Sequence, residues 1–198
     1  MTTPIVKLAA VWLTSVLTSL APVPMGGKVD ASESPAERQS RIESIAADFA
    51  EVIYDPEEVP IFMGPKGREQ SAVIGATFAV EEGMNLSRGV DTGKILGDSG
   101  KSFCIMQINV GKGKTKEGWT GPDLIADRKK CIRAGMRMLR RSFWTCKANP
   151  IKERFAVYAS GNCVVGRDIS LRRWDRAMRQ LHLTPPPVVP AEPSQLTD

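Results

Sequence analysis

Apolar residues recur at helical spacing after Ser34. Ser34 is followed by Pro35, and Glu37 lies three residues after the serine, which is the pattern of a capping box at the first turn of a helix. The apolar positions that follow are three or four residues apart: Ile42, Ile45, Phe49, Val52 and Ile53. This spacing predicts a helix that buries one face.

Later segments predict further helices and one strand. A nearly continuous apolar segment over residues 70–82 predicts a central helix, although Gly75 lies inside it. We expect further helices over residues 123–143, 150–161 and 170–181. Residues 103–110 instead alternate, with Cys104, Met106 and Ile108 on one face and Gln107 and Asn109 on the other. Together these elements predict an α+β fold that is mostly α.

The two ends of the chain differ from its middle in composition. Lys7 is the only charge before Lys28, and an apolar run from Leu8 to Ala21 follows it. A short basic start before a short apolar run is typical of a secretory signal peptide, with a membrane anchor as the alternative. We therefore expect a leader or anchor over residues 1–21, a linker over 22–33, one domain over 34–182 and a Pro-rich disordered tail over 183–198.

Charge and residue counts narrow the possible chemistry. The net charge of +5 indicates either a solvated basic surface or an anionic partner. The single histidine, His182, argues against a Ser-His-Asp triad and against a metal site built from several histidines. We expect neither a metal nor a cofactor. The four cysteines form no CxxC pair, and an even number in an exported protein favours disulfides.

Glu81 is the candidate for acid catalysis. It follows Phe78 and Val80, so its surroundings can be apolar, and partial burial helps a carboxyl group to retain the proton that cleavage of a glycosidic bond requires. Glu82 lies about 100° further around the helix and is expected to face another way. The alternative is that both are solvated carboxylates at a helix end.

Four short segments, in order, resemble the lytic transglycosylases and lysozyme-like enzymes. They are Glu81-Glu82-Gly83, Cys104-Ile105-Met106-Gln107, Cys131-Ile132-Arg133-Ala134-Gly135 and Val157-Tyr158-Ala159-Ser160-Gly161. The family shows Glu-Ser-Gly, Gly-Leu-Met-Gln, Asn-Ile-x-x-Gly and Ala-Tyr-Asn-Ala-Gly at these places. The resemblance covers roughly residues 70–165 and implies a lysozyme-like fold with a small β-hairpin insert.

The resemblance also implies roles for single residues. Glu81 would be the catalytic acid and base, Gln107 would line the glycan groove, and Tyr158 would lie close to the acid. Met106 and Asn109 would line or support the groove. The alternatives are that Met106 is a core residue and that Tyr158 is a packed aromatic residue whose hydroxyl is satisfied. The chain departs from the family pattern at three positions, which are Glu82, Cys104 and Ala159.

The implied function is cleavage of the β-1,4 bond between MurNAc and GlcNAc in peptidoglycan. A lytic transglycosylase uses one glutamate and leaves 1,6-anhydroMurNAc ends, whereas a lysozyme commonly adds a second carboxylate. Asp98 and Asp91, both in the Gly-rich turn, are the candidates for that second group. A non-catalytic peptidoglycan-binding module is a further alternative. We expect a periplasmic or extracellular location, which argues against a nucleic-acid partner.

The expected helices also suggest a disulfide pairing. If helices 123–143 and 150–161 form an antiparallel hairpin, Cys131 and Cys163 lie side by side, and the family arrangement would bring Cys104 to the same end. Cys146 would then lie roughly 18 Å away at 1.5 Å per residue, too far for a disulfide. Either the 144–150 segment doubles back or Cys146 is unpaired, and we expect Cys131–Cys163 as one bridge.

Overall fold

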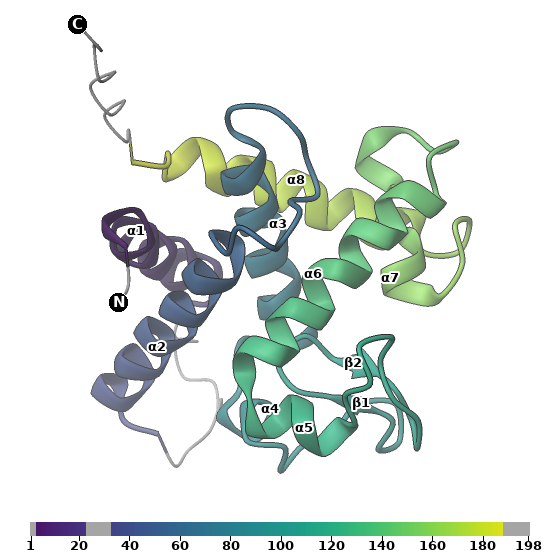
Figure 1. The fold of residues 1–198 in the computed structure, drawn as a ribbon, viewed down its shortest axis with the longest axis horizontal. Coiled ribbons are helices and arrows are strands. Elements are labelled where there is room, and N and C mark those ends of the chain that lie inside the picture. Colours follow the sequence, from purple (N-terminus) through teal and green to yellow (C-terminus); the bar gives the residue numbers. More distant parts are fainter. Residues whose placement is uncertain (1–2, 23–32, 188–198) are drawn as a thin grey trace, which may run out of the picture.

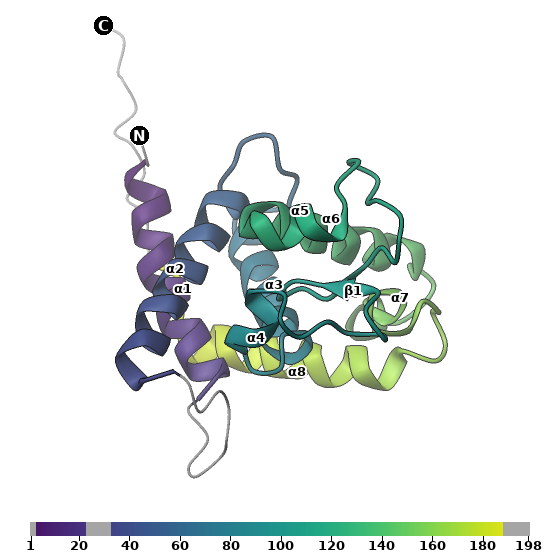
Figure 2. The ribbon, with the colours of Figure 1, turned by 90° about the horizontal axis from the view of Figure 1, so that it is seen from below.

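A central helix organises the fold. The computed structural model describes residues 3–22 and 33–187. Helix α3 (Gly67–Glu82) buries every residue from Ser71 to Val80, as its nearly continuous apolar sequence predicts. It packs against α2 (Pro35–Ile53), α6 (Arg128–Thr145) and α8 (Arg167–Leu183), and lies between α6 and α8 (Figures 1 and 2). The protein is mostly helical, with one small antiparallel sheet.

Helix α1 (Pro4–Leu20) lies alongside α2 at one end of the molecule (Figures 1 and 2). Its side chains Leu13, Val16 and Leu17 are fully buried, and Trp12 Nε1 donates a hydrogen bond to the Thr184 carbonyl at 2.9 Å. Within the described part of the chain, no helix has both the length and the apolar character needed to cross a membrane. Removal of residues 1–21 as a leader stays a prediction.

The start of α2 agrees with the sequence, and the start of α6 does not. Ser34 and Glu37 form the expected capping box. The single helix expected over residues 123–143 is instead two, α5 (Gly121–Ala126) and α6, because Asp127 adopts an extended conformation between them. The Asp127 side chain accepts hydrogen bonds from the backbone N–H groups of Lys129 and Lys130 and so begins α6.

The strand expected over residues 103–110 is wrong in its extent. After the short helix α4 (Arg88–Asp91), strand β1 (Ser102–Phe103) pairs with β2 (Ile108–Asn109) in a hairpin. The chain reverses between them because Cys104 and Gln107 have positive φ angles of 61° and 47°. Residues 104–106 are buried in this turn. The alternation of apolar and polar residues over 103–110 therefore belongs to a buried turn and not to one long strand.

The segment after α6 also differs from expectation. In place of a helix over 150–161, the chain forms a 3₁₀ turn η1 (Ile151–Glu153) and the short helix α7 (Ala156–Ser160). Gly161 follows with a φ of 71°, a left-handed conformation that glycine adopts without strain, and ends α7. The chain then turns back toward the end of α6, where Asn149 Nδ2 donates a hydrogen bond to the Cys163 carbonyl at 2.7 Å.

This reversal decides the disulfides. Cys104 is bonded to Cys131 and Cys146 to Cys163, so the expected Cys131–Cys163 bridge is wrong. The error came from the length of the helix predicted over residues 150–161. A helix of that length would have brought Cys163 back alongside Cys131. Two disulfides are typical of a protein that folds in an oxidising compartment.

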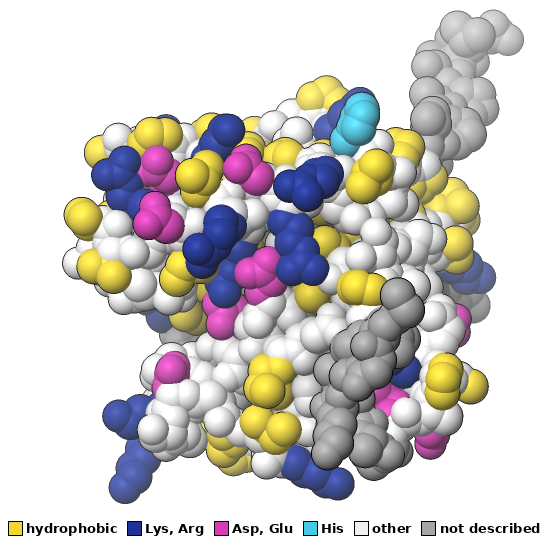
Figure 3. All heavy atoms as spheres, turned by 180° about the vertical axis from the view of Figure 1, so that it is seen from behind, with side chains coloured by type: hydrophobic (Ala, Val, Ile, Leu, Met, Phe, Trp, Pro, Cys, Tyr) yellow, Lys and Arg dark blue, Asp and Glu magenta, His cyan; other side chains and the backbone are white. Residues whose placement is uncertain are grey.

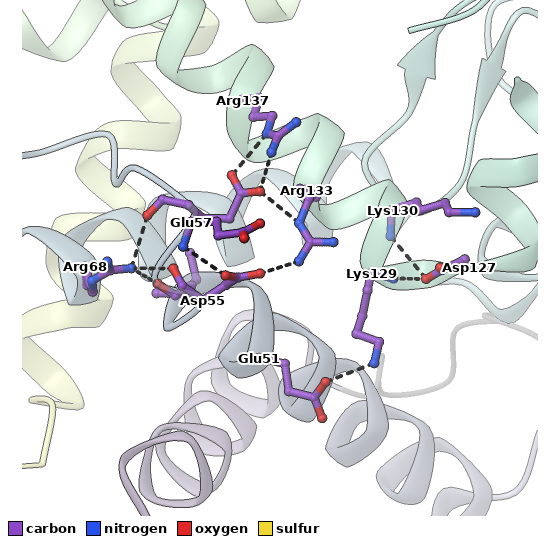
Figure 4. Close-up of polar contacts among 11 residues, drawn as sticks. Glu51, Asp55, Glu57, Arg68, Asp127, Lys129, Lys130, Arg133 and Arg137 are labelled. Atoms are coloured by element: carbon purple, nitrogen blue, oxygen red, sulfur yellow. Dashed lines mark hydrogen bonds and ion pairs between the residues drawn. The ribbon is translucent and has the colours of Figure 1, made fainter. Parts of the chain in front are cut away.

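Salt bridges join α6 to the loop that follows α2. Arg133 contacts Asp55 at 2.7 Å and Glu58 at 2.9 Å, and Arg137 contacts Glu58 at 2.6 Å (Figure 4). Nearer the start of α6, Lys129 pairs with Glu51 of α2 at 2.9 Å. These contacts hold one face of α6, leaving its opposite side available to the sheet and α7.

The expected linker falls mostly in residues 23–32 and the expected tail mostly in 188–198, both outside the described residues.

Candidate functional site

A cleft of about 620 Å³ lies between the end of α3, the β hairpin, α6 and α7. Polar side chains from segments far apart in the sequence line it, together with Met138 of α6: Glu82, Asp98, Gln107, Asn109, Tyr158 and Ser160. Three of the five residues to which the resemblance assigns a role are among them, namely Gln107, Asn109 and Tyr158, and so is Asp98, a candidate for the second carboxylate. Glu81 and Met106 are not.

Glu81 and Glu82 point to different sides of the end of α3, as expected from their angular offset. Glu81 lies away from the cleft, where its carboxylate contacts Arg176 at 2.8 Å and Arg173 at 3.1 Å. Glu82 lines the cleft and accepts a hydrogen bond from Nη1 of the same Arg173. The two carboxylates have similar exposure, 27% and 24% of their side chains, so exposure alone does not separate them.

Arg173 couples the two acids to α8. Only 10% of its side chain is exposed, and its guanidinium lies over the Phe78 ring at 4.7 Å from the centroid. Five arginines lie along α8, and from the sequence such a basic run is more often a solvated surface than a functional one: Arg167, Arg172, Arg173, Arg176 and Arg179. For Arg173 that interpretation is wrong, because it is buried against α3. Figure 3, in which the cyan His182 marks the C-terminal end of α8, shows acidic and basic side chains next to each other on this face.

Tyr158 connects the cleft to the turn between the strands. Its hydroxyl donates a hydrogen bond to the Met106 carbonyl at 2.5 Å, and its ring packs edge-on against Phe78 at 5.2 Å. Burial raises the pKa of Tyr158 far above its usual value, and the negative charge of Glu82 raises it further while Arg173 opposes the rise. Tyr158 is therefore a neutral hydroxyl close to Glu82.

Two motif glycines allow the four segments to approach one another. A Cβ atom on Gly135 would lie 2.4 Å from the Met106 side chain, and one on Gly83 would lie 2.4 Å from the Ala79 carbonyl oxygen and 3.0 Å from that of Ile105. The Cys104–Cys131 disulfide and the Tyr158 hydrogen bond connect the same turn to α6 and α7. The four segments that resemble the family thus converge on residues 104–107. Met106 is fully buried and does not line the cleft.

Hydrogen bonds fix the hairpin side of the cleft. Asp98 Oδ2 accepts from Ser102 Oγ at 2.5 Å and from Asn109 Nδ2 at 3.0 Å. Gln107 Nε2 donates to the Cys104 carbonyl at 2.9 Å, and a Cβ atom on Gly97 would lie 1.9 Å from Gln107 Oε1. Asp98 is thus an exposed carboxylate on the same cleft as Glu82. Asp91, the other candidate, lies elsewhere and binds Arg128 at 2.8 Å.

Sequence reasoning missed the positions of Glu82, Met138 and Arg173. The one available signal for Arg173 was its place three residues before Arg176 on a predicted helix, which puts the two arginines on one face. In the described part of the chain, no cluster of histidine, cysteine, aspartate and glutamate side chains is arranged to hold a metal ion.

The chain was compared with family models, curated proteins and solved structures, and none of them matches it.

Proposed function

We propose that this protein cleaves the β-1,4 glycosidic bond between MurNAc and GlcNAc in peptidoglycan, with Glu82 as the acid and base. The observation that supports this most is the cleft itself. Glu82, Gln107 and Tyr158 line it, and they come from three of the four segments that resemble lytic transglycosylases; Asn109, two residues after one of these segments, lines it as well. A groove-facing acid beside hydrogen-bonding side chains is what cleavage of a sugar–sugar bond needs.

The proposal moves the catalytic role from Glu81 to the next residue. Glu81 is engaged by two arginines and does not line the cleft, so it cannot reach a sugar bound there without breaking both ion pairs. Among the described residues Glu82 has one ion-pair partner, Arg173, which also contacts Glu81 and the Phe78 ring. Substrate can therefore break the ion pair between Arg173 and Glu82 while Arg173 keeps its contacts with Glu81 and Phe78.

In the proposed reaction, substrate first takes the place of Arg173 beside Glu82, and Glu82 acts from its protonated form in that complex. It gives the proton to the leaving oxygen, the bond between that oxygen and the anomeric carbon breaks, and the N-acetyl oxygen of MurNAc attacks the anomeric carbon. The Glu82 carboxylate then takes a proton from the 6-hydroxyl of the same sugar. The freed oxygen replaces the N-acetyl oxygen at the anomeric carbon and closes the 1,6-anhydro ring. No water is consumed, and no metal, cofactor or second carboxylate is required. We propose an exported lytic transglycosylase with a lysozyme-like fold.

A lysozyme-type hydrolase is the second candidate, because Asp98 lies on the same cleft as Glu82. Mass spectrometry of fragments from purified cell walls separates the two. Anhydro-muramyl ends identify the transglycosylase, and reducing ends with one added water identify the hydrolase. The Asp98→Asn variant should keep most activity in the first case and lose it in the second.

The test of the proposed acid is the Glu82→Gln variant in a wall-clearing assay. We expect a loss of about 10²–10⁴-fold, the usual contribution of general acid–base catalysis. Clearing by folded Glu82→Gln protein at the unaltered rate would refute the assignment. Wall binding without release of fragments by the unaltered protein would favour a non-catalytic binding module.

A further inference from the structure

A groove extends from the cleft along α6. Asn109 and Met138 line both the cleft and an adjoining cavity of about 160 Å³. Arg137 and Arg141 in turn line both that cavity and a further one of about 450 Å³, which reaches Trp144 near the end of α6. We call these two adjoining cavities the side groove. A ligand that leaves the cleft over Met138 enters it directly.

The side groove has cations without acidic partners. Three acids line it. Glu58 and Glu117 are engaged, since Arg137 contacts them at 2.6 Å and 3.3 Å and Arg133 also contacts Glu58 (Figure 4 shows both arginines). Glu57 is exposed and forms no ion pair within the described residues. The side chains of Lys116 and Arg141 are exposed, and neither side chain has a hydrogen bond or ion pair within residues 3–22 and 33–187. Lys114 and Arg140 also line the side groove and have no acidic partner among these residues. The unpaired positive charges therefore exceed the one unpaired acid, and they remain available to a ligand.

An aromatic surface ends the side groove. Trp144 is 56% exposed although its neighbour Phe143 is buried, and the two rings pack edge-on at 5.7 Å. The contact with Phe143 holds one edge of the indole and leaves the rest of the ring in the groove. Such a ring can pack on the apolar part of a ligand whose charged groups contact Lys116 and Arg141.

We propose that the side groove binds the carboxylate-bearing peptide attached to the glycan strand, and thereby makes the enzyme select peptide-substituted glycan. This inference rests on the proposed function. The sugar backbone carries no charge, whereas the peptide attached to MurNAc ends in carboxylates and contains others. Lys116 and Arg141 supply the matching charge, and the shared lining of Asn109 and Met138 lets one ligand occupy the cleft and the side groove together.

The test measures binding in a Glu82→Gln background, so that no cleavage takes place. The probes are a glycan tetrasaccharide that carries its peptides and the same tetrasaccharide without them. The Lys116→Ala/Arg141→Ala double variant should weaken binding of the peptide-bearing probe about fivefold to tenfold, because each exposed ion pair contributes up to about 1 kcal/mol. Binding of the peptide-free probe should not change.

A matched control removes the same charge elsewhere. Lys94 and Arg172 are exposed and lie outside the cleft and the side groove. The Lys94→Ala/Arg172→Ala double variant should bind both probes as before. The inference is overturned if both double variants weaken the peptide-bearing probe equally, or if Lys116→Ala/Arg141→Ala weakens both probes equally.

The failure of this inference differs from the failure of the proposed function. If the unaltered enzyme clears walls but the Lys116→Ala/Arg141→Ala variant binds the peptide-bearing probe as tightly as before, only the proposed role of the side groove is refuted. A protein that binds the peptide through these residues but whose unaltered form releases no fragments refutes the proposed function instead.

Discussion

The two sides of the C-terminal end of α3 carry the same functional group in opposite settings. On the closed side, Glu81 pairs with Arg173 and Arg176, and Arg176 also donates to the Leu20 carbonyl at the end of α1 at 2.5 Å. On the open side, Glu82 lines a cleft of about 620 Å³ and has Arg173 as its one ion-pair partner among the described residues. One carboxylate joins helices to each other, whereas its neighbour faces the space where a ligand fits.

This difference shows that a motif can place chemistry near a site without fixing which residue performs it. Consecutive helical residues differ by about 100° in direction, so a shift of one position moves a side chain from the cleft to the side of the helix end that faces the α8 arginines. That side is determined by α8 and α1, which lie outside the four motif segments.

The largest expected effect is on the closed side, from removal of residues 1–21. Three fully buried side chains of α1, Leu13, Val16 and Leu17, together contribute roughly 5–9 kcal/mol, similar to the whole free energy of unfolding of a typical domain. If α1 is retained in the folded protein rather than removed as a leader, residues 22–198 should show no cooperative thermal transition by near-UV circular dichroism.

The control for this truncation is Val11→Ser, at a position on α1 that is 70% exposed, which should leave the transition unchanged. A truncated chain that melts at the temperature of the full chain would contradict this expectation. It would instead support the interpretation of residues 1–21 as a leader that the folded protein does not need.

A smaller effect is expected where the two sides meet, at Arg173. Arg173→Met keeps an apolar side chain against Phe78 but leaves Glu82 without an ion-pair partner among the described residues, and Glu81 with Arg176 alone. Because these groups are partly buried, we expect a loss of about 3 kcal/mol in the free energy of unfolding, measured by urea denaturation. The neighbouring exposed residue provides the control, since Arg172→Met should cost almost nothing. Equal stability of the two variants would show that the Arg173 ion pairs do not hold α8 to α3.

The smallest effect is expected on the open side, from Tyr158→Phe. The lost hydrogen bond to the Met106 carbonyl should cost about 1 kcal/mol in the free energy of unfolding. Tyr54, whose hydroxyl bonds to Glu69 at 3.1 Å outside the cleft, offers a matched comparison. Both Tyr→Phe variants should lose similar stability, but Tyr158→Phe alone should slow wall clearing. A similar loss of activity in both would mean that Tyr158 acts through stability alone.

Local sequence signals predicted the parts of the fold that depend on local interactions. The Ser34–Glu37 capping box and the buried α3 both follow from side chains within a few residues of one another. The predicted strand over 103–110 failed because the positive φ angles at Cys104 and Gln107 are stabilised by the disulfide to Cys131 and by the Tyr158 hydrogen bond, both distant in sequence.

The candidate site was predictable in its composition but not in its geometry. Gln107, Asn109, Tyr158 and Asp98 were identified from the sequence, and all four line the cleft. The choice between Glu81 and Glu82 depends on Arg173 and Arg176, which are more than 90 residues away. The helical period predicts that two consecutive acids face different sides of the helix, but it does not determine which side faces the cleft.

The most direct test of the account is a comparison of Glu81→Gln with Glu82→Gln on purified peptidoglycan, with the released fragments counted by mass spectrometry and folding checked by thermal melting. We predict that Glu82→Gln folds and releases about 10²–10⁴-fold fewer fragments, and that Glu81→Gln melts at a lower temperature but keeps fragment release within about tenfold of the unaltered protein. The reverse result, an inactive but folded Glu81→Gln beside an active Glu82→Gln, would contradict the assignment of Glu82 as the acid.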